Sequence, residues 1–143
     1  MNKEKSITFL EEVSTQFGDW ENLELWIIDT ISNEGYTVGE ISFVFMNDTD
    51  LLDYNRKFLD HDYFTDVITF DYVDFNLING DILISVDRII DNAKLLKINY
   101  LDEFCRVVIH GVLHLCGFKD KTDKDISLMR NREEFYLERR SFT

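Results

Sequence analysis

The sequence has no proline, only two cysteines and three histidines, and no long apolar run. The lack of proline excludes proline-rich linkers and cis-proline turns. Two thiols, Cys105 and Cys116, cannot form a disulfide framework, and we expect both to be reduced and packed in the core. No apolar stretch approaches the roughly 18 residues of a membrane-spanning helix, and the N-terminal residues lead into no secretion signal. These absences predict a soluble, cytoplasmic protein without a membrane partner.

Basic residues are also scarce in the first third of the chain. Residues 6–55 contain 11 acidic residues and no Lys or Arg, and the whole chain has a formal net charge of −13. This balance argues against a protein that binds nucleic acid through bulk positive charge. Residues 104–143 differ, because 8 basic residues outnumber 6 acidic ones there. The acidity therefore belongs mainly to the N-terminal part of the chain.

The residues that are present predict one domain over residues 1–143. Apolar residues make up 45% of the 143 positions and include 12 Phe, which is enough for one core, and the chain shows no repeat or linker. Periodicity predicts an α+β fold, with a small mixed β-sheet of about four strands packed with about five helices. The expected strands are 6–10, 38–46, 66–71 and 80–86, the last two forming a hairpin with a loop around 76–79. The expected helices run from a cap at Asp19 to Gly35, from 48 to 58, from a cap at Ser85 or Asp87 to 97, from 101 to 116, and from Thr122 to 139.

Two histidines four residues apart carry the main chemical signal. On a helix, His110 and His114 differ by about 40° around the axis, so both imidazoles can reach one metal ion. Gly117 allows the chain to reverse, so that Asp120 can return to the same ion. Two imidazoles and one carboxylate leave a fourth position for water, which is the open geometry of catalytic zinc.

Chance spacing and a peptidase site are two alternatives for this histidine pair. Histidine pairs with this spacing also occur by chance, but a polar pair among apolar neighbours is costly to bury without partners, and a metal ion would satisfy both. In zinc peptidases of the His-Glu-x-x-His type, the residue after the first histidine is the general base. Here it is Gly111, so a peptidase of that type is disfavoured.

The segment 110–120 resembles the signature of a known family. It reads His-Gly-Val-Leu-His-Leu-Cys-Gly-Phe-Lys-Asp, and it is similar to His-Gly-x-Leu-His-Leu-x-Gly-Tyr-Asp-His of the bacterial YbeY family of metal-dependent endoribonucleases. Residues 65–70 resemble the family's Thr-Asp-Val-Leu-Ser-Phe strand, and residues 80–85 resemble its Gly-Asp-Ile strand. Met129 and Glu133 resemble residues of its last helix. The resemblance implies a zincin-like fold, in which the metal-bearing helix packs on the sheet.

Two departures from the family bear on the site. The family's third ligand is a histidine, and this chain has Asp120 there. Because aspartate is a competent zinc ligand, we expect one Zn²⁺ per chain on His110, His114 and Asp120, with a tilt toward other, harder divalent ions. The family's catalytic arginine falls on Leu59. Arg56, one helical turn earlier, is our candidate for that catalytic role, or it is an ordinary solvated arginine.

The resemblance implies hydrolysis of single-stranded ribosomal RNA, in maturation of the small ribosomal subunit and in ribosome quality control. It also implies that the small subunit or its proteins are partners and that DNA is not a substrate. Two alternatives are a ribosome-assembly factor with a mainly structural metal and a metallohydrolase of another substrate. Asp81 is either an orienting partner of a metal ligand or a structural carboxylate. Candidate phosphate contacts, if they are not simply a solvated helix face, are Lys119, Lys121, Lys124, Arg130 and Arg132.

Overall fold

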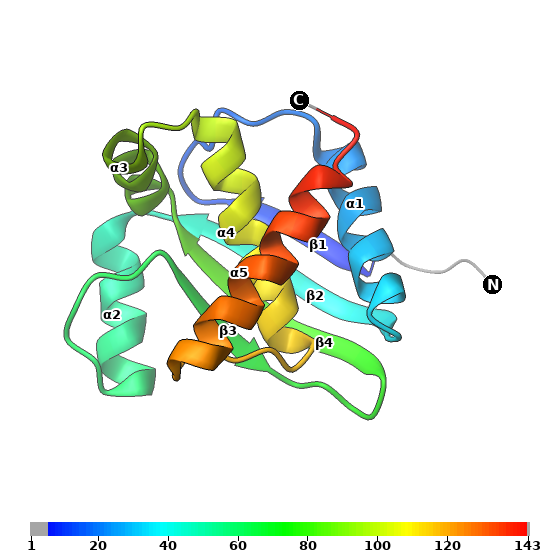
Figure 1. Cartoon of the computed structure of the whole chain (residues 1–143). Coiled ribbons are helices and arrows are strands. Elements are labelled where there is room, and N and C mark those ends of the chain that lie inside the picture. Colours follow the sequence, from blue (N-terminus) through cyan, green and yellow to red (C-terminus); the bar gives the residue numbers. More distant parts are fainter. Residues whose placement is uncertain (1–5, 143) are drawn as a thin grey trace.

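The computed structural model describes residues 6–142, which form a four-stranded sheet and five helices (Figure 1). The strands are β1 (Ile7–Glu11), β2 (Thr37–Met46), β3 (Val67–Asp71) and β4 (Leu77–Ser85). The helices are α1 (Trp20–Asn33), α2 (Asp48–Leu59), α3 (Val86–Leu96), α4 (Tyr100–Leu115) and α5 (Asp123–Glu138). The predicted α+β class is confirmed.

The sheet has the strand order β1-β2-β4-β3 and is mixed. Strands β1, β2 and β4 are parallel, while β3 pairs antiparallel with β4 in the predicted hairpin. Strands β1 and β3 form the two edges of the sheet.

The main core lies between the sheet and three helices. Helix α1 packs on β2, helix α4 crosses β3 and β4, and α5 packs on the outside of α4 (Figure 1). Alternate residues of β2 point into this core, where Phe45 stacks on Phe104 of α4 with ring centroids 5.5 Å apart. Helix α2 covers part of the other face through a smaller cluster that includes Leu51 and Leu83.

Strand β4 begins earlier than the sequence analysis predicts. We expected a loop around 76–79, but Leu77 and Ile78 pair with Thr37 and Val38 of β2. The chain instead reverses just before them, where Phe75 has a left-handed φ of 55°. The prediction was wrong here because a partner strand, rather than local turn propensity, decides where β4 starts.

The helix ends follow the predicted capping residues. The Ser85 side chain accepts from the Arg88 amide and caps α3, which decides between Ser85 and Asp87. Thr122 and Asp125 form a full capping box at the start of α5. No helix within residues 6–142 is long and apolar enough to cross a membrane.

Candidate metal centre

Helix α4 carries both histidines on one face, next to the face that packs on the sheet. On the sheet side, α4 lies so close to β4 that a Cβ at Gly111 would lie 2.8 Å from Ile82 Cγ2. The imidazoles of His110 and His114 lie side by side with ring centroids 4.5 Å apart. The predicted shared face is confirmed.

A glycine turn at the end of α4 brings the chain back to these histidines. Gly117 has a φ of 100°, and the amides of Gly117 and Phe118 bond to the carbonyls of His114 and Leu113 at 3.0 and 3.1 Å. This is a Schellman motif, which requires a left-handed residue at that position. After the turn, the Phe118 carbonyl lies 2.9 Å from Nδ1 of His114.

The Nδ1 atoms of both imidazoles face groups that only accept hydrogen bonds. His114 Nδ1 donates to the Phe118 carbonyl, and His110 Nδ1 donates to Oε2 of Glu133 on α5 at 2.5 Å. A neutral imidazole has one N–H, so these partners place it on Nδ1 and leave the lone pair on Nε2. Both Nε2 atoms face the same atom, Oδ2 of Asp120, at 3.4 and 3.2 Å.

The donor set fits a divalent ion. Two lone pairs directed at a carboxylate repel it, unless a second proton or a metal ion lies between them. Ligand atoms held tetrahedrally about 2.0–2.1 Å from one ion lie about 3.4 Å apart, close to the two measured Nε2–Oδ2 distances. The side chains of His110 and His114 are 16% and 22% exposed and that of Asp120 is 44% exposed, so the group opens to solvent beside the carboxylate. His110, His114 and Asp120 therefore form a group that could hold a metal ion.

The two thiols lie outside this group. Cys105 and Cys116 are both buried, as predicted. Burial raises the pKa of Cys105 to about 11 and that of Cys116 to about 12, so both thiols stay protonated at neutral pH.

The structure does not bring Arg56 to the histidines. Its side chain is half exposed on α2, where it pairs with Asp62 at 2.5 Å and Asp53 at 4.0 Å. Leu59, at the position of the family arginine, is the last residue of the same helix and is exposed.

Of the two alternatives for Asp81, the position of its neighbours favours a structural carboxylate over an orienting partner of a metal ligand. Its neighbours Gly80 and Ile82 face α4, where they approach Leu115 and Gly111. Because side chains alternate along a strand, Asp81 points to the other face of the sheet. Glu133 contacts a histidine instead. The resemblance singled out Glu133, but nothing in the sequence pairs an α5 residue with a histidine 23 positions earlier.

Four of the five candidate phosphate contacts are exposed. Lys119 and Lys121 flank Asp120, Lys124 is the second residue of α5 and Arg130 lies further along that helix. None of the four makes an ion pair within residues 6–142, whereas Arg132 is engaged with Glu34 at 2.9 Å.

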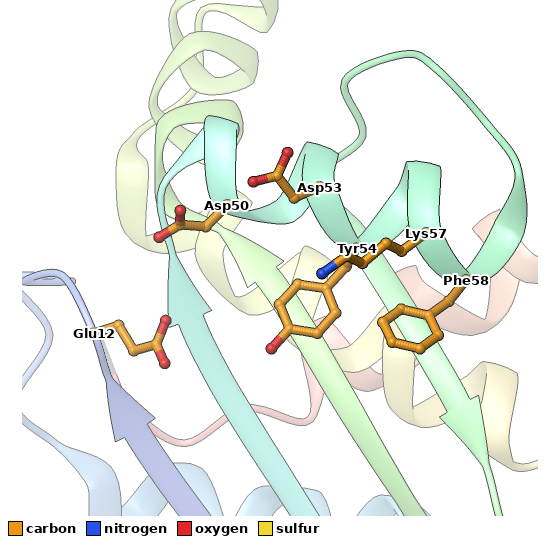
Figure 2. Close-up of a pocket in the computed structure, with 6 residues that line it drawn as sticks. All are labelled: Glu12, Asp50, Asp53, Tyr54, Lys57 and Phe58. Carbon is orange, nitrogen blue, oxygen red and sulfur yellow. The ribbon is translucent and has the colours of Figure 1, made fainter.

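A cavity of about 430 Å³ lies elsewhere, between α2 and the end of β1. Figure 2 shows its lining, with Glu12, Asp50 and Asp53 around the rings of Tyr54 and Phe58 and the amine of Lys57. The histidines take no part in it. This cavity is therefore separate from the candidate metal group, and its lining is predominantly acidic.

Two imidazoles and a carboxylate that are open to solvent form a donor set of the kind that metal-dependent hydrolases use. The model of the family "Endoribonuclease YbeY" matches residues 6–141. The chain is 52% identical to endoribonuclease YbeY of Porphyromonas gingivalis over 109 residues, covering 76% of this chain and 72% of the relative. It is 42% identical to that of Cytophaga hutchinsonii over 143 residues, covering 99% and 100%.

A solved structure agrees with this assignment. The solution structure of TM1509 from Thermotoga maritima superposes with a TM-score of 0.67 at 27% identity, covering 92% of this chain and 87% of that one. The chain belongs to the YbeY endoribonuclease family. It is accordingly an endoribonuclease, a hydrolase whose substrate is RNA.

Proposed function

We propose that this protein is a zinc-dependent, single-strand-specific endoribonuclease, which acts in the cytoplasm in maturation of small-subunit ribosomal RNA and in ribosome quality control. The observation that carries the proposal is the convergence of two Nε2 atoms on the Asp120 carboxylate, with both Nδ1 atoms already engaged. A zinc ion held by His110, His114 and Asp120 would supply a Lewis acid and lower the pKa of water toward about 7.

Other residues of the chain would orient the ligands and bind the RNA. The Phe118 carbonyl orients the His114 imidazole, and the half-exposed Asp120 borders the opening through which RNA reaches the site. The exposed Lys119, Lys121 and Lys124 would bind phosphates on either side of the scissile bond.

Arg56 remains our candidate for the role of the family's arginine. Its pair with Asp62 lies on the surface, and such pairs contribute only about 0–1 kcal/mol, so a phosphate could displace the carboxylate.

The same arginine favours a second candidate function. With Leu59 at the family's arginine position and Arg56 engaged by Asp62, the chain could assemble with the small subunit, keep its metal structurally and cleave little. A peptidase is disfavoured, because Gly111 packs on Ile82 and leaves no general base after the first histidine.

Cleavage of a ribosomal RNA fragment tests the proposal. Purified protein with bound metal is incubated with the fragment, either single-stranded or annealed to its complement. We expect cleavage of the single strand only, and a loss of at least about 100-fold in His114→Ala. Equal cleavage by His114→Ala would indicate a contaminating nuclease. Folded, metal-loaded protein that binds the small subunit without cutting would favour the assembly role.

A further inference from the structure

A buried cluster of charges lies behind His110, on the side away from Asp120. Glu103 and Glu133 are 0% and 2% exposed, which is unusual for carboxylates, and Arg106 lies between them. The Arg106 guanidinium donates to both oxygens of Glu103, at 2.8 and 2.5 Å, and reaches Oε1 of Glu133 at 3.4 Å.

Two more residues extend this cluster to the segment before β3. Arg106 lies 3.6 Å from Asp66, and the Asn92 amide of α3 donates to both Asp66 and Glu103 at 3.3 Å. Three carboxyl groups thus surround one guanidinium. A buried carboxyl group is costly unless polar or cationic groups partner it, and Glu133 contacts both the Arg106 guanidinium and the His110 imidazole.

The geometry separates the role of Glu133 from that of Glu103. Arg106 is bound bidentately by Glu103, whereas the shortest contact of Glu133 is Oε2 to Nδ1 of His110, at 2.5 Å. Glu133 therefore interacts more closely with His110 than with Arg106. The two imidazoles are also unequally supported, because His114 donates to a neutral carbonyl and His110 to a carboxylate.

We propose that Glu133, held by Arg106, is the positioning residue of His110. It keeps the N–H on Nδ1, points Nε2 at the ion, makes this imidazole the stronger donor of the two and so sets the metal affinity of the site. This inference rests on the proposed metal site, and it adds a residue of α5 and a buried charge cluster to it.

Metal affinity in matched variants tests the inference. Glu133→Gln removes the charge and keeps an acceptor, Glu133→Met removes both, and Glu134→Gln is the control because Glu134 is its exposed neighbour on α5. Zinc affinity is measured by competition with a chelator. We expect the Kd to rise about 10- to 100-fold in Glu133→Gln, to rise further in Glu133→Met and to stay unchanged in Glu134→Gln.

The ¹⁵N shifts of the His110 ring in metal-free wild-type protein give a second readout, which needs no variant to fold. At a pH where the ring is neutral, we expect Nδ1 to carry the proton. A ring protonated on Nε2, or a Glu133→Gln protein with wild-type affinity, would overturn the inference while leaving the metal site intact. Wild-type protein that binds no divalent ion would instead overturn the proposed function, and this inference with it.

Discussion

Asp120 is the residue that distinguishes this centre from one made only of imidazoles. It is the most exposed of the three candidate ligands, and one of its oxygens faces both Nε2 atoms. A carboxylate adds a negative charge and a hard oxygen donor. A site with a carboxylate at this position therefore favours ions such as Mn²⁺ more than a site with an imidazole there would. The side chain at position 120 should therefore influence which ion binds.

Replacing Asp120 by histidine tests this influence. We expect Asp120→His to keep zinc binding and to weaken Mn²⁺ binding by about tenfold or more relative to zinc, because a hard donor is exchanged for imidazole. Isothermal titration of each ion into metal-free protein gives the ratio of affinities. An unchanged ratio in Asp120→His would show that Asp120 does not contact the ion.

The residues of the candidate site were only partly predictable from the sequence. Spacing within one helix and one turn predicts the meeting of His110, His114 and Asp120, because local geometry fixes all three positions. Glu133 and Arg106 were not predictable in this way, since their contacts depend on how α5 packs against α4. The sequence left two alternatives open for Asp81, because the face toward which its side chain points depends on which side of the sheet α4 covers.

At the scale of elements, α4 joins the sheet to the site. This helix packs on β3 and β4 at Gly111, while the adjacent face carries the histidines, and His110 contacts Glu133 of α5. The distance between α4 and the sheet is set at Gly111, where no side chain fits without displacing Ile82. A side chain at this position should therefore lower the stability of the fold and change the geometry of the candidate site.

A methyl group at Gly111 is the smallest test of this packing. We expect Gly111→Ala to lower the free energy of unfolding by about 1–3 kcal/mol through overpacking, despite the better helix propensity of alanine. Chemical denaturation gives the value. The control is Gly18→Ala, where a Cβ meets nothing within 4 Å and we expect a change below about 0.5 kcal/mol. Equal effects of the two substitutions would contradict the close approach of α4 to β4.

The order of helices and strands was predictable from the sequence, because caps, glycines and periodicity mark most of the ends. Thr122 and Gly117 act as their residue types predict. The start of β4 was not predictable, because Leu77 and Ile78 are in a strand only through pairing with β2.

At the scale of the whole molecule, unpaired basic residues adjoin the candidate site although the chain as a whole is acidic. Lys119 and Lys121 flank Asp120 in the chain and Lys124 follows in the first turn of α5, and no salt bridge involves these three lysines within residues 6–142. The net charge of −13 still repels RNA at longer range. We therefore expect weak, salt-sensitive binding of free RNA, and a substantial contribution to binding from the ribosomal particle.

The salt dependence of RNA binding tests the role of these three lysines. Each phosphate contact to a single strand contributes about 0.7 to the slope of log affinity against log salt. Replacing Lys119, Lys121 and Lys124 by Gln should reduce that slope by about 2, while Lys94→Gln with Lys97→Gln on the α3 side should leave it unchanged. Tight binding that is independent of salt would contradict this distribution of contacts.

Stability of the whole domain should fall at alkaline pH. Burial raises the pKa of Cys105 to about 11 and that of Cys116 to about 12, above the ordinary value of 9.0. The folded state thus favours the neutral thiols, and this stabilisation is complete below about pH 9 and is lost as the pH rises toward 11–12.

Denaturation between pH 8 and 11 measures this effect. We expect the free energy of unfolding to fall more steeply in wild-type protein than in Cys116→Ala, by at most about 1.4 kcal/mol per pH unit for the missing thiol. Identical pH slopes for the two proteins would contradict the burial of this thiol in the folded core.

The most direct test of the central claim is a titration of metal-free protein with Zn²⁺, in which the rate of cleavage of a single-stranded RNA is followed. The three converging ligands predict a rate that rises linearly and levels off at one ion per chain, and no such rise in His114→Ala. Full activity without added metal, or the same titration curve in His114→Ala, would contradict the claim that His110, His114 and Asp120 form the catalytic centre.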